Sequence, residues 1–157
     1  RSEVAPIEDD NFKQYFSQDN FFLWTKGDKT QLLEEMAESL SVGETDDFKQ
    51  SLLYEIKQRE KLSSVVFSEK IAVSHPIRPL GKEVKVSVAI CQEPLSWDNQ
   101  GSDVQLVFLL SPSKYGNEGL ADVTTKIVSL TENDDLQKQL IKCKDFDEFI
   151  TIFEKIT

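Results

Sequence analysis

The sequence predicts an α+β domain in which helices on both faces sandwich a central β-sheet. Two helical patterns come first, a block of β-branched and apolar strand patterns follows, and three helical patterns end the chain. Helices both before and after the strands suit a sheet that is covered on both faces. The 157 residues are 39% hydrophobic and 29% charged, which is a globular composition able to bury one sizeable core.

The first 27 residues are predicted to lead into this domain, which we expect to cover residues 28–157. Residues 1–11 are acidic and contain Pro6, so they indicate a linker. An aromatic cluster follows, at Phe12, Tyr15, Phe16, Phe21, Phe22 and Trp24. The favoured interpretation is an arm laid on this domain, and the alternative is a surface for a neighbouring domain. Because the only Met is Met36, we expect the sequence to be a piece of a longer polypeptide.

The first helix is expected to open at Asp28, because Asp28 and Gln31 form a capping-box pattern. Apolar residues then recur at helical spacing, at Leu32, Leu33, Met36, Ala37 and Leu40. Gly43 suits the end of this helix. A second helix is predicted over about residues 46–60, which places Arg59 in its last turn or just beyond it.

Strands are expected in the middle of the chain. Residues 65–67 and 71–73 are β-branched or aromatic, and residues 84–90 alternate between apolar and other side chains. Residues 104–110 are almost all apolar, which is typical of a central strand covered on both faces. The stretch 93–103 between the last two strands is predicted to be a loop.

Three helices are predicted to end the chain. The first carries its apolar residues between Leu120 and Leu130. Two further capping-box patterns, Asp134 with Gln137 and Asp145 with Glu148, are expected to open the other two.

Composition and motifs argue against several classes of function. A net charge of −10 argues against binding to a nucleic-acid backbone, and no apolar run approaches the ~20 residues that a membrane span needs. One histidine and two distant cysteines argue against a metal site, and no GxGxxG or GxxxxGK[ST] motif indicates a nucleotide cofactor. We therefore expect no cofactor, no metal, no membrane contact and no direct nucleic-acid contact by this domain. Cys91 is interpreted as buried packing and Cys143 as a helix residue that faces the core, in a reduced, cytoplasmic setting.

The single histidine, His75, follows a strand pattern and precedes Pro76. Proline cannot extend a central ladder, so the strand should end near His75 and the imidazole should face a loop. A neutral imidazole is a nucleophile that needs no deprotonation. On its own, the pattern fits an exposed loop histidine as well as a reactive one.

A longer segment around His75 carries a family resemblance. Residues 59–75 read REKLSSVVFSEKIAVSH, which resembles the phosphohistidine segment of enzyme IIA domains of the fructose/mannitol class of the bacterial phosphotransferase system (PTS). That segment typically reads R-E-x-L-G-S-T-x-I-G-N-G-V-A-I-P-H. Without a gap, the identical positions are Arg59, Glu60, Leu62, Ser64, Ala72 and His75. The resemblance continues through VAICQEPLSWD (88–98) and VQLVFLLSPS (104–113), and it covers about residues 28–156.

The resemblance implies the same sandwiched sheet, with mixed strand directions, and a set of site residues. His75 would accept a phosphoryl group from the histidine-containing phosphocarrier protein HPr. Arg59 would hold the phosphoryl oxygens with its planar fork, and Ser64 would donate its hydroxyl. Arg78 is a further candidate for the clamp, or a solvated loop residue. In the family, the phosphoryl group usually passes on to a cysteine of an enzyme IIB partner.

The sequence also departs from the family. Many members carry a second His at a position that is Gly119 here, and Val65 replaces a Thr. These departures favour a phosphorylatable regulatory enzyme IIA-like domain, covalently linked to upstream domains of a sugar-responsive BglG-type transcriptional regulator or antiterminator. The aromatic pairs at 15–16 and 21–22 resemble the linker of such regulators. The alternatives are an enzyme IIA subunit that relays phosphate to enzyme IIB, and an interaction module without chemistry. Whether such a phosphoryl carrier counts as an enzyme is left open.

Overall fold

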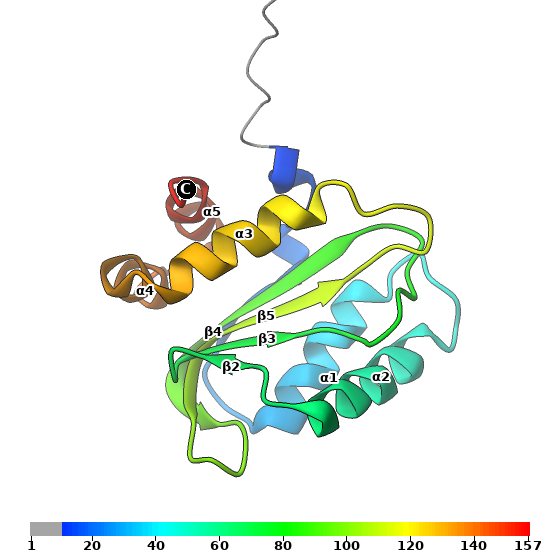
Figure 1. Ribbon diagram of the computed structural model, residues 1–157, viewed down its shortest axis with the longest axis horizontal. Helices are drawn as coiled ribbons and strands as arrows, with labels where there is room; N and C mark the ends of the chain where they lie inside the picture. The colour runs from blue at the N-terminus through cyan, green and yellow to red at the C-terminus, as the bar shows by residue number, and fades with distance from the viewer. Residues whose placement is uncertain (1–10) are drawn as a thin grey trace, which may run out of the picture.

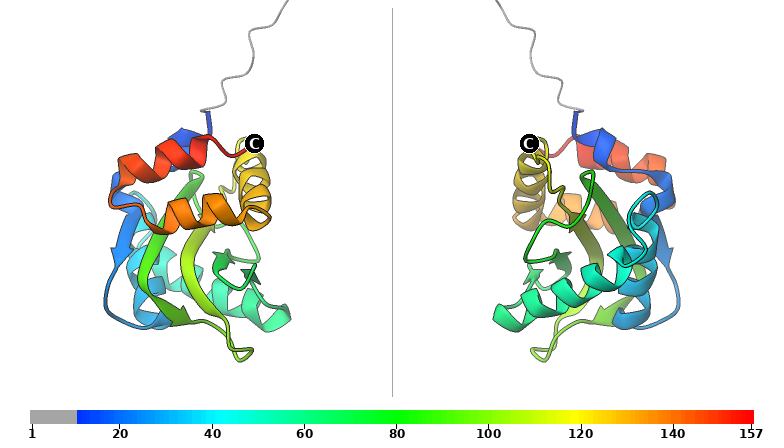
Figure 2. Two further views of the ribbon diagram at one scale, coloured as in Figure 1. Left: turned by 90° about the vertical axis from the view of Figure 1, so that its left-hand side faces the viewer. Right: turned by 90° about the vertical axis from the view of Figure 1, so that its right-hand side faces the viewer.

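The computed structural model describes residues 11–157, which form three layers. A five-stranded sheet lies in the middle. Helices α1 (Lys29–Leu40) and α2 (Phe48–Leu62) cover one face, and α3 (Leu120–Thr131), α4 (Asp134–Ile141) and α5 (Phe146–Glu154) cover the other (Figure 1). The side views in Figure 2 show the same sandwich. No helix within residues 11–157 is long and apolar enough to cross a membrane.

The sheet is mixed, so the predicted fold class is confirmed. Its strands run in the order β1 (Phe21–Trp24), β4 (Lys85–Ser96), β5 (Asp103–Ser111), β3 (Ile71–Ser74) and β2 (Val66–Phe67). The pairs β1–β4 and β3–β5 are parallel, whereas β4–β5 and β2–β3 are antiparallel. The central strand β5 is covered on both faces, as its apolar pattern predicts, because alternate residues enter the two separate cores.

Strand β4 is longer than predicted. The expected loop over 93–103 begins only after Ser96, because the pairing with β5 resumes at Leu95 beyond an irregularity in register. The parallel partner β1 ends opposite Cys91. Beyond that point β4 has one open edge and exposed side chains, so the apolar pattern stops although the strand continues.

The segment predicted as an aromatic arm is packed into the domain. The short 3₁₀ turns η1 (Asn11–Tyr15) and η2 (Gln18–Asn20) lead into β1, which adds an edge strand to the sheet. Phe12 and Phe16 are buried, with ring centroids 5.7 Å and 5.3 Å from that of Phe153 on α5. The described part of this segment thus packs on the domain and contributes a strand to its sheet. Most of the predicted linker, residues 1–10, lies outside the described residues.

The helix caps follow the sequence at two of the three expected positions. Asp28 and Gln31 make both bonds of the capping box, and the Asp145 side chain accepts from the Glu148 backbone N–H. The third prediction was wrong, because α4 is capped by Asn133 instead of Asp134. Its Gln137 is buried and donates to the carbonyl of Leu130 at 2.9 Å, which links α4 to α3.

Candidate functional site

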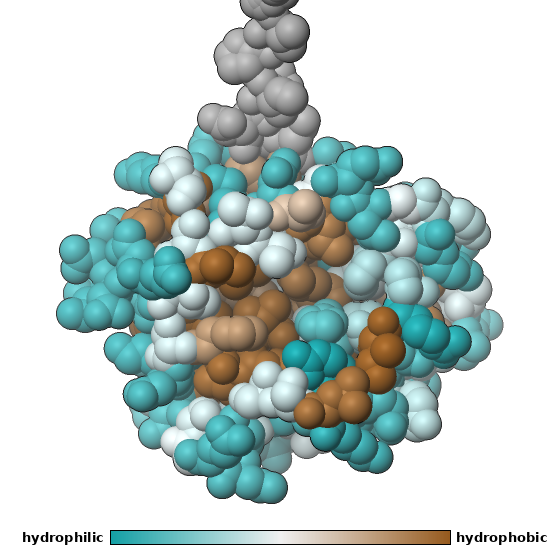
Figure 3. Space-filling model, in the orientation of Figure 1, coloured by the Kyte–Doolittle hydropathy of each residue, from teal (hydrophilic) through white to brown (hydrophobic). Residues whose placement is uncertain are grey.

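His75 and Arg59 line one cavity between the sheet and helix α3. The cavity has a volume of about 440 Å³ and its other walls are mainly apolar. They are formed by Phe67, Val73, Leu110, Pro112, Leu120, Thr124, Ile127, Val128 and Thr131. Figure 3 shows apolar side chains gathered over this face of the molecule. The cavity therefore holds a nucleophile and a cation in otherwise apolar surroundings.

His75 directly follows β3, so the predicted strand end is confirmed. Its Nδ1 lies 3.0 Å from the carbonyl oxygen of Pro76. A carbonyl oxygen only accepts, so this contact assigns the hydrogen of the neutral ring to Nδ1. The lone pair of the neutral ring is then on Nε2, which makes Nε2 the nucleophilic atom.

Arg59 lies in the last turn of α2, as predicted. Its Nη1 donates to the carbonyl oxygen of Ser63 at 3.0 Å and to the Ser63 hydroxyl at 3.2 Å. Within the described part of the chain, Nε and Nη2 of Arg59 have no partner. The guanidinium is thus held by one nitrogen, and its remaining donors can bind an anion in the cavity.

Ser64 and Arg78 lie outside this cavity. The Ser64 hydroxyl donates to Asp98 Oδ2 at 3.2 Å in a separate hollow. Arg78 donates through Nε and Nη2 to Glu55 Oε2 at 3.0 and 2.8 Å. This bonding to Arg78 lowers the pKa of the Glu55 carboxyl. Of the four residues considered from the sequence, the structure brings together His75 and Arg59 only.

Gly119 is the N-cap residue of α3, next to Leu120 in the cavity wall. A β-carbon at position 119 would lie 2.7 Å from Cζ of Tyr15 and closer still to its hydroxyl. A side chain at this position therefore requires Tyr15 to move. The sequence singled out Gly119 but gave no sign that Tyr15 covers it.

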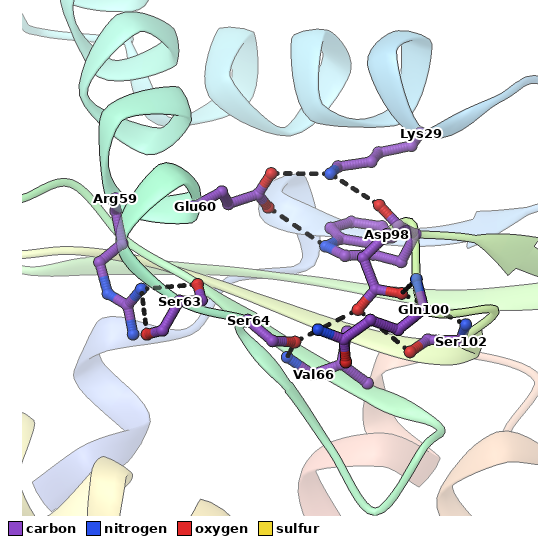
Figure 4. A network of polar contacts seen from close by, with 10 residues as sticks. Lys29, Arg59, Glu60, Ser63, Ser64, Val66, Asp98, Gln100 and Ser102 are labelled. Carbon is purple, nitrogen blue, oxygen red and sulfur yellow. Dashed lines mark hydrogen bonds and ion pairs between the residues drawn. The ribbon is translucent and has the colours of Figure 1, made fainter.

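A polar network beside the site was also missed from the sequence. Figure 4 shows it around the end of α2. Lys29 Nζ pairs with Glu60 Oε1 at 2.7 Å and donates to the carbonyl of Trp97 at 2.9 Å. Trp97 Nε1 in turn donates to Glu60 Oε2 at 3.2 Å. Glu60 and Trp97 lie in the two segments that carry the resemblance, which is the one sequence signal that connects them.

Both cysteines are buried, and neither lines the cavity. Burial raises the pKa of Cys91 to about 12, so its thiol is an inert packing group, as expected. Cys143 was placed wrongly in a helix. It lies in the turn between α4 and α5, where burial and the nearby carboxylates of Glu148 and Asp145 raise its pKa to about 11.

Comparisons with known proteins agree with this architecture. The family model described as "Phosphoenolpyruvate-dependent sugar phosphotransferase system, EIIA 2" matches residues 14–156. A curated relative, the probable licABCH operon regulator of Bacillus subtilis (strain 168), is 27% identical over 106 residues. The match covers 68% of this chain and 16% of the relative, so the chain spans about a sixth of that relative's length.

Solved structures share the fold. The nitrogen regulatory protein IIA-Ntr from Neisseria meningitidis matches with a TM-score of 0.73 and 20% identity, over 89% of this chain and 97% of its own. IIA mannitol from Escherichia coli matches with a TM-score of 0.66 and 18% identity, over 87% and 97%. The complex of enzyme IIAMtl with phosphorylated enzyme IIBMtl from Escherichia coli matches with a TM-score of 0.67 and 17% identity, over 88% and 97%.

Proposed function

Because the chain belongs to the EIIA 2 family of the phosphoenolpyruvate-dependent sugar phosphotransferase system, we propose that it accepts a phosphoryl group on His75 from HPr. The observation that carries the proposal is that His75, the one histidine of the sequence, lines the same cavity as Arg59. A nucleophilic nitrogen and a planar cation in one cavity suit a phosphoryl group, whose charge is spread over its oxygens.

The transfer step follows from the tautomer of His75. The lone pair of Nε2 attacks the phosphorus of the donor's phosphohistidine, and an N–P bond forms while the donor's N–P bond breaks. The departing donor imidazole keeps the electron pair of the donor N–P bond that breaks. The Nδ1–H group donates to the Pro76 carbonyl oxygen throughout, and this hydrogen bond stabilises the positive charge that develops on the ring. Arg59 binds the phosphoryl oxygens, and the apolar walls keep water from the new N–P bond.

The proposed biological role is that of a regulatory domain in a sugar-responsive bacterial transcriptional regulator or antiterminator, in the cytoplasm and covalently linked to upstream domains. The match to an operon regulator supports this role. The contact between Tyr15 and Gly119 also supports it, because it leaves no room for a second imidazole at position 119. The added charge of about −2 at His75 would then alter contacts with neighbouring domains.

The alternative function is an enzyme IIA subunit that relays phosphate to enzyme IIB. The observation in its favour is the fold shared with enzyme IIAMtl, which was solved in complex with phosphorylated enzyme IIBMtl. The two functions differ in the second transfer, which a relay subunit must catalyse rapidly.

The test is to incubate the protein with phosphoenolpyruvate, enzyme I and HPr and to measure its intact mass. We expect a gain of one phosphate that is lost in acid and absent from a His75→Gln variant. No gain with an active donor system, or an unchanged gain in His75→Gln, would contradict the proposal. Adding an enzyme IIB cysteine domain afterwards separates the functions: rapid loss of the label to enzyme IIB would favour the relay subunit.

A further inference from the structure

Side chains at the end of helix α2 and just beyond it point in two directions. Figure 4 shows Arg59 and Ser63 together on one side of the chain, while Glu60 and Ser64 point the other way. Arg59 reaches the His75 cavity, and Ser64 lies in a separate hollow beside the loop between β4 and β5. The loop and the cavity are therefore connected through four residues at the end of one helix.

Asp98 is the centre of the contacts on the loop side. Its Oδ1 accepts from the backbone N–H groups of Gln100 and Ser102, at 3.0 and 3.3 Å. Its Oδ2 accepts from the hydroxyls of Ser102 and Ser64, at 3.1 and 3.2 Å. Burial raises the pKa of Asp98, but these hydrogen bonds outweigh it and hold the pKa below its usual value. Three donors belong to the loop itself, and only the Ser64 hydroxyl comes from another segment, the connection that follows α2.

Ser64 connects this carboxylate to the residue that holds Arg59. Its hydroxyl donates to Asp98 and accepts from the Val66 backbone N–H at 3.1 Å, which orders the chain between α2 and β2. The preceding residue, Ser63, binds Arg59 with both its carbonyl oxygen and its hydroxyl. Ser63 and Ser64 are both exposed, so hydrogen bonds and not burial hold this segment in place.

A second contact fixes the segment one turn earlier. The loop residue next to Asp98 is Trp97, which is buried and donates to Glu60 Oε2 at 3.2 Å. Lys29 binds the other oxygen of Glu60. Adjacent loop residues thus hold the chain at positions 60 and 64, on either side of Ser63.

We propose that Asp98, acting through the Ser64 hydroxyl, is a positioning residue that fixes the Arg59 guanidinium toward the His75 cavity. A donor that is already in place needs no reorganisation when charge moves onto the phosphoryl oxygens. Ser64 then contributes to the site by holding Arg59, and not as a direct donor. The effect on phosphoryl transfer rests on the proposed function, whereas the effect on the order of Arg59 does not.

The first experiment compares Ser64→Ala with Ser102→Ala. Both remove one hydroxyl from Asp98, but the Ser102 bond stays inside the loop and does not reach α2. The readout is the heteronuclear NOE of the Arg59 Nε–H group. Its signal is assigned as the one that is lost in the Arg59→Lys variant. We expect this NOE to fall clearly in Ser64→Ala. It should keep its parent value in Ser102→Ala and in Ser64→Thr, which retains a hydroxyl at position 64. An unchanged NOE in Ser64→Ala, or an equal fall in Ser102→Ala, overturns the inference.

The second experiment measures phosphorylation of His75 in a double-mutant cycle. We expect Ser64→Ala to slow the transfer roughly three- to tenfold, and to have no effect in an Arg59→Ala background, because it acts through Arg59. An equal slowing in both backgrounds would mean a merely structural role and would overturn the inference. If the parent protein takes no phosphate at all, the proposed function fails, and the NOE still decides the inference.

Discussion

The ring of Tyr15 occupies the space in which a side chain at position 119 would begin. Tyr15 belongs to the N-terminal segment, and Gly119 caps the helix that forms one wall of the His75 cavity. The start of the described chain is therefore in contact with the site wall. The absence of a side chain at position 119 is therefore matched to the position of Tyr15 in this protein.

The first prediction concerns this contact. Gly119→Ala should destabilise the domain by about 1–3 kcal/mol, because the new methyl group overpacks against Tyr15. The cost should vanish in a Tyr15→Ala background, as measured by chemical denaturation of all four proteins. Equal costs in both backgrounds would show that the two residues do not interact.

The second prediction adds an imidazole at position 119, where Tyr15 occupies the space. Gly119→His alone should destabilise the protein, whereas Tyr15→Ala combined with Gly119→His should fold and exchange phosphate with HPr faster than Tyr15→Ala. Stopped-flow or rapid-quench phosphorylation checks this rate. No acceleration in the double variant would mean that position 119 does not face the transferred group.

The third prediction compares two arginines. Arg59→Lys should slow phosphorylation of His75 roughly ten- to a hundredfold, because the loss of a charge-assisted hydrogen bond corresponds to ~1.5–3 kcal/mol. Arg78→Lys is the matched control, since Arg78 pairs with Glu55 outside the cavity. Equal rates in the two variants would leave Arg59 without a role in the transfer.

The fourth prediction compares two buried serines. Ser74 Oγ is buried without a partner among residues 11–157, whereas the Ser87 hydroxyl donates to the Asn20 carbonyl at 2.9 Å. Ser74→Ala should stabilise the domain by about 1 kcal/mol, and Ser87→Ala should destabilise it by about 1–3 kcal/mol. The free energies of unfolding in urea check the signs. A destabilised Ser74→Ala variant would indicate that its hydroxyl has a bound partner such as water.

The fifth prediction is a pH dependence. The hydrogen bonds to Asp98 lower its pKa in the folded protein, so its unfolded state binds a proton more readily. The stabilisation is present above the unfolded value of 3.8 and is lost as the pH falls through the lower folded value. The stability difference between the parent and Asp98→Asn should therefore shrink below about pH 3.8. A difference that stays constant in urea unfolding at pH 7 and below pH 3 would contradict this assignment.

Local patterns predicted the element types and part of the site. The Asp28–Gln31 box and the apolar spacing after it depend on neighbours within one helix, so their geometry could be read directly from the chain. The position of α4 could not, because Asn133 and Asp134 are both good caps. The buried bond between Gln137 and the Leu130 carbonyl depends on how two helices pack, and local spacing does not encode it.

The sequence by itself determined a sheet covered by helices on both faces, the strand end at His75 and the helix end at Arg59, since periodicity and proline act locally. The mixed strand directions were implied only by the family resemblance. The resemblance implied one site for Arg59 and His75, and the tertiary structure shows the cavity that they share. The tertiary structure alone decided that Arg78 contacts Glu55 and that Ser64 contacts Asp98, 34 residues away. It also placed Tyr15 on Gly119. The physical reason is that these partners come from different elements. Their contacts depend on the packing of helices on the sheet, which local spacing does not encode.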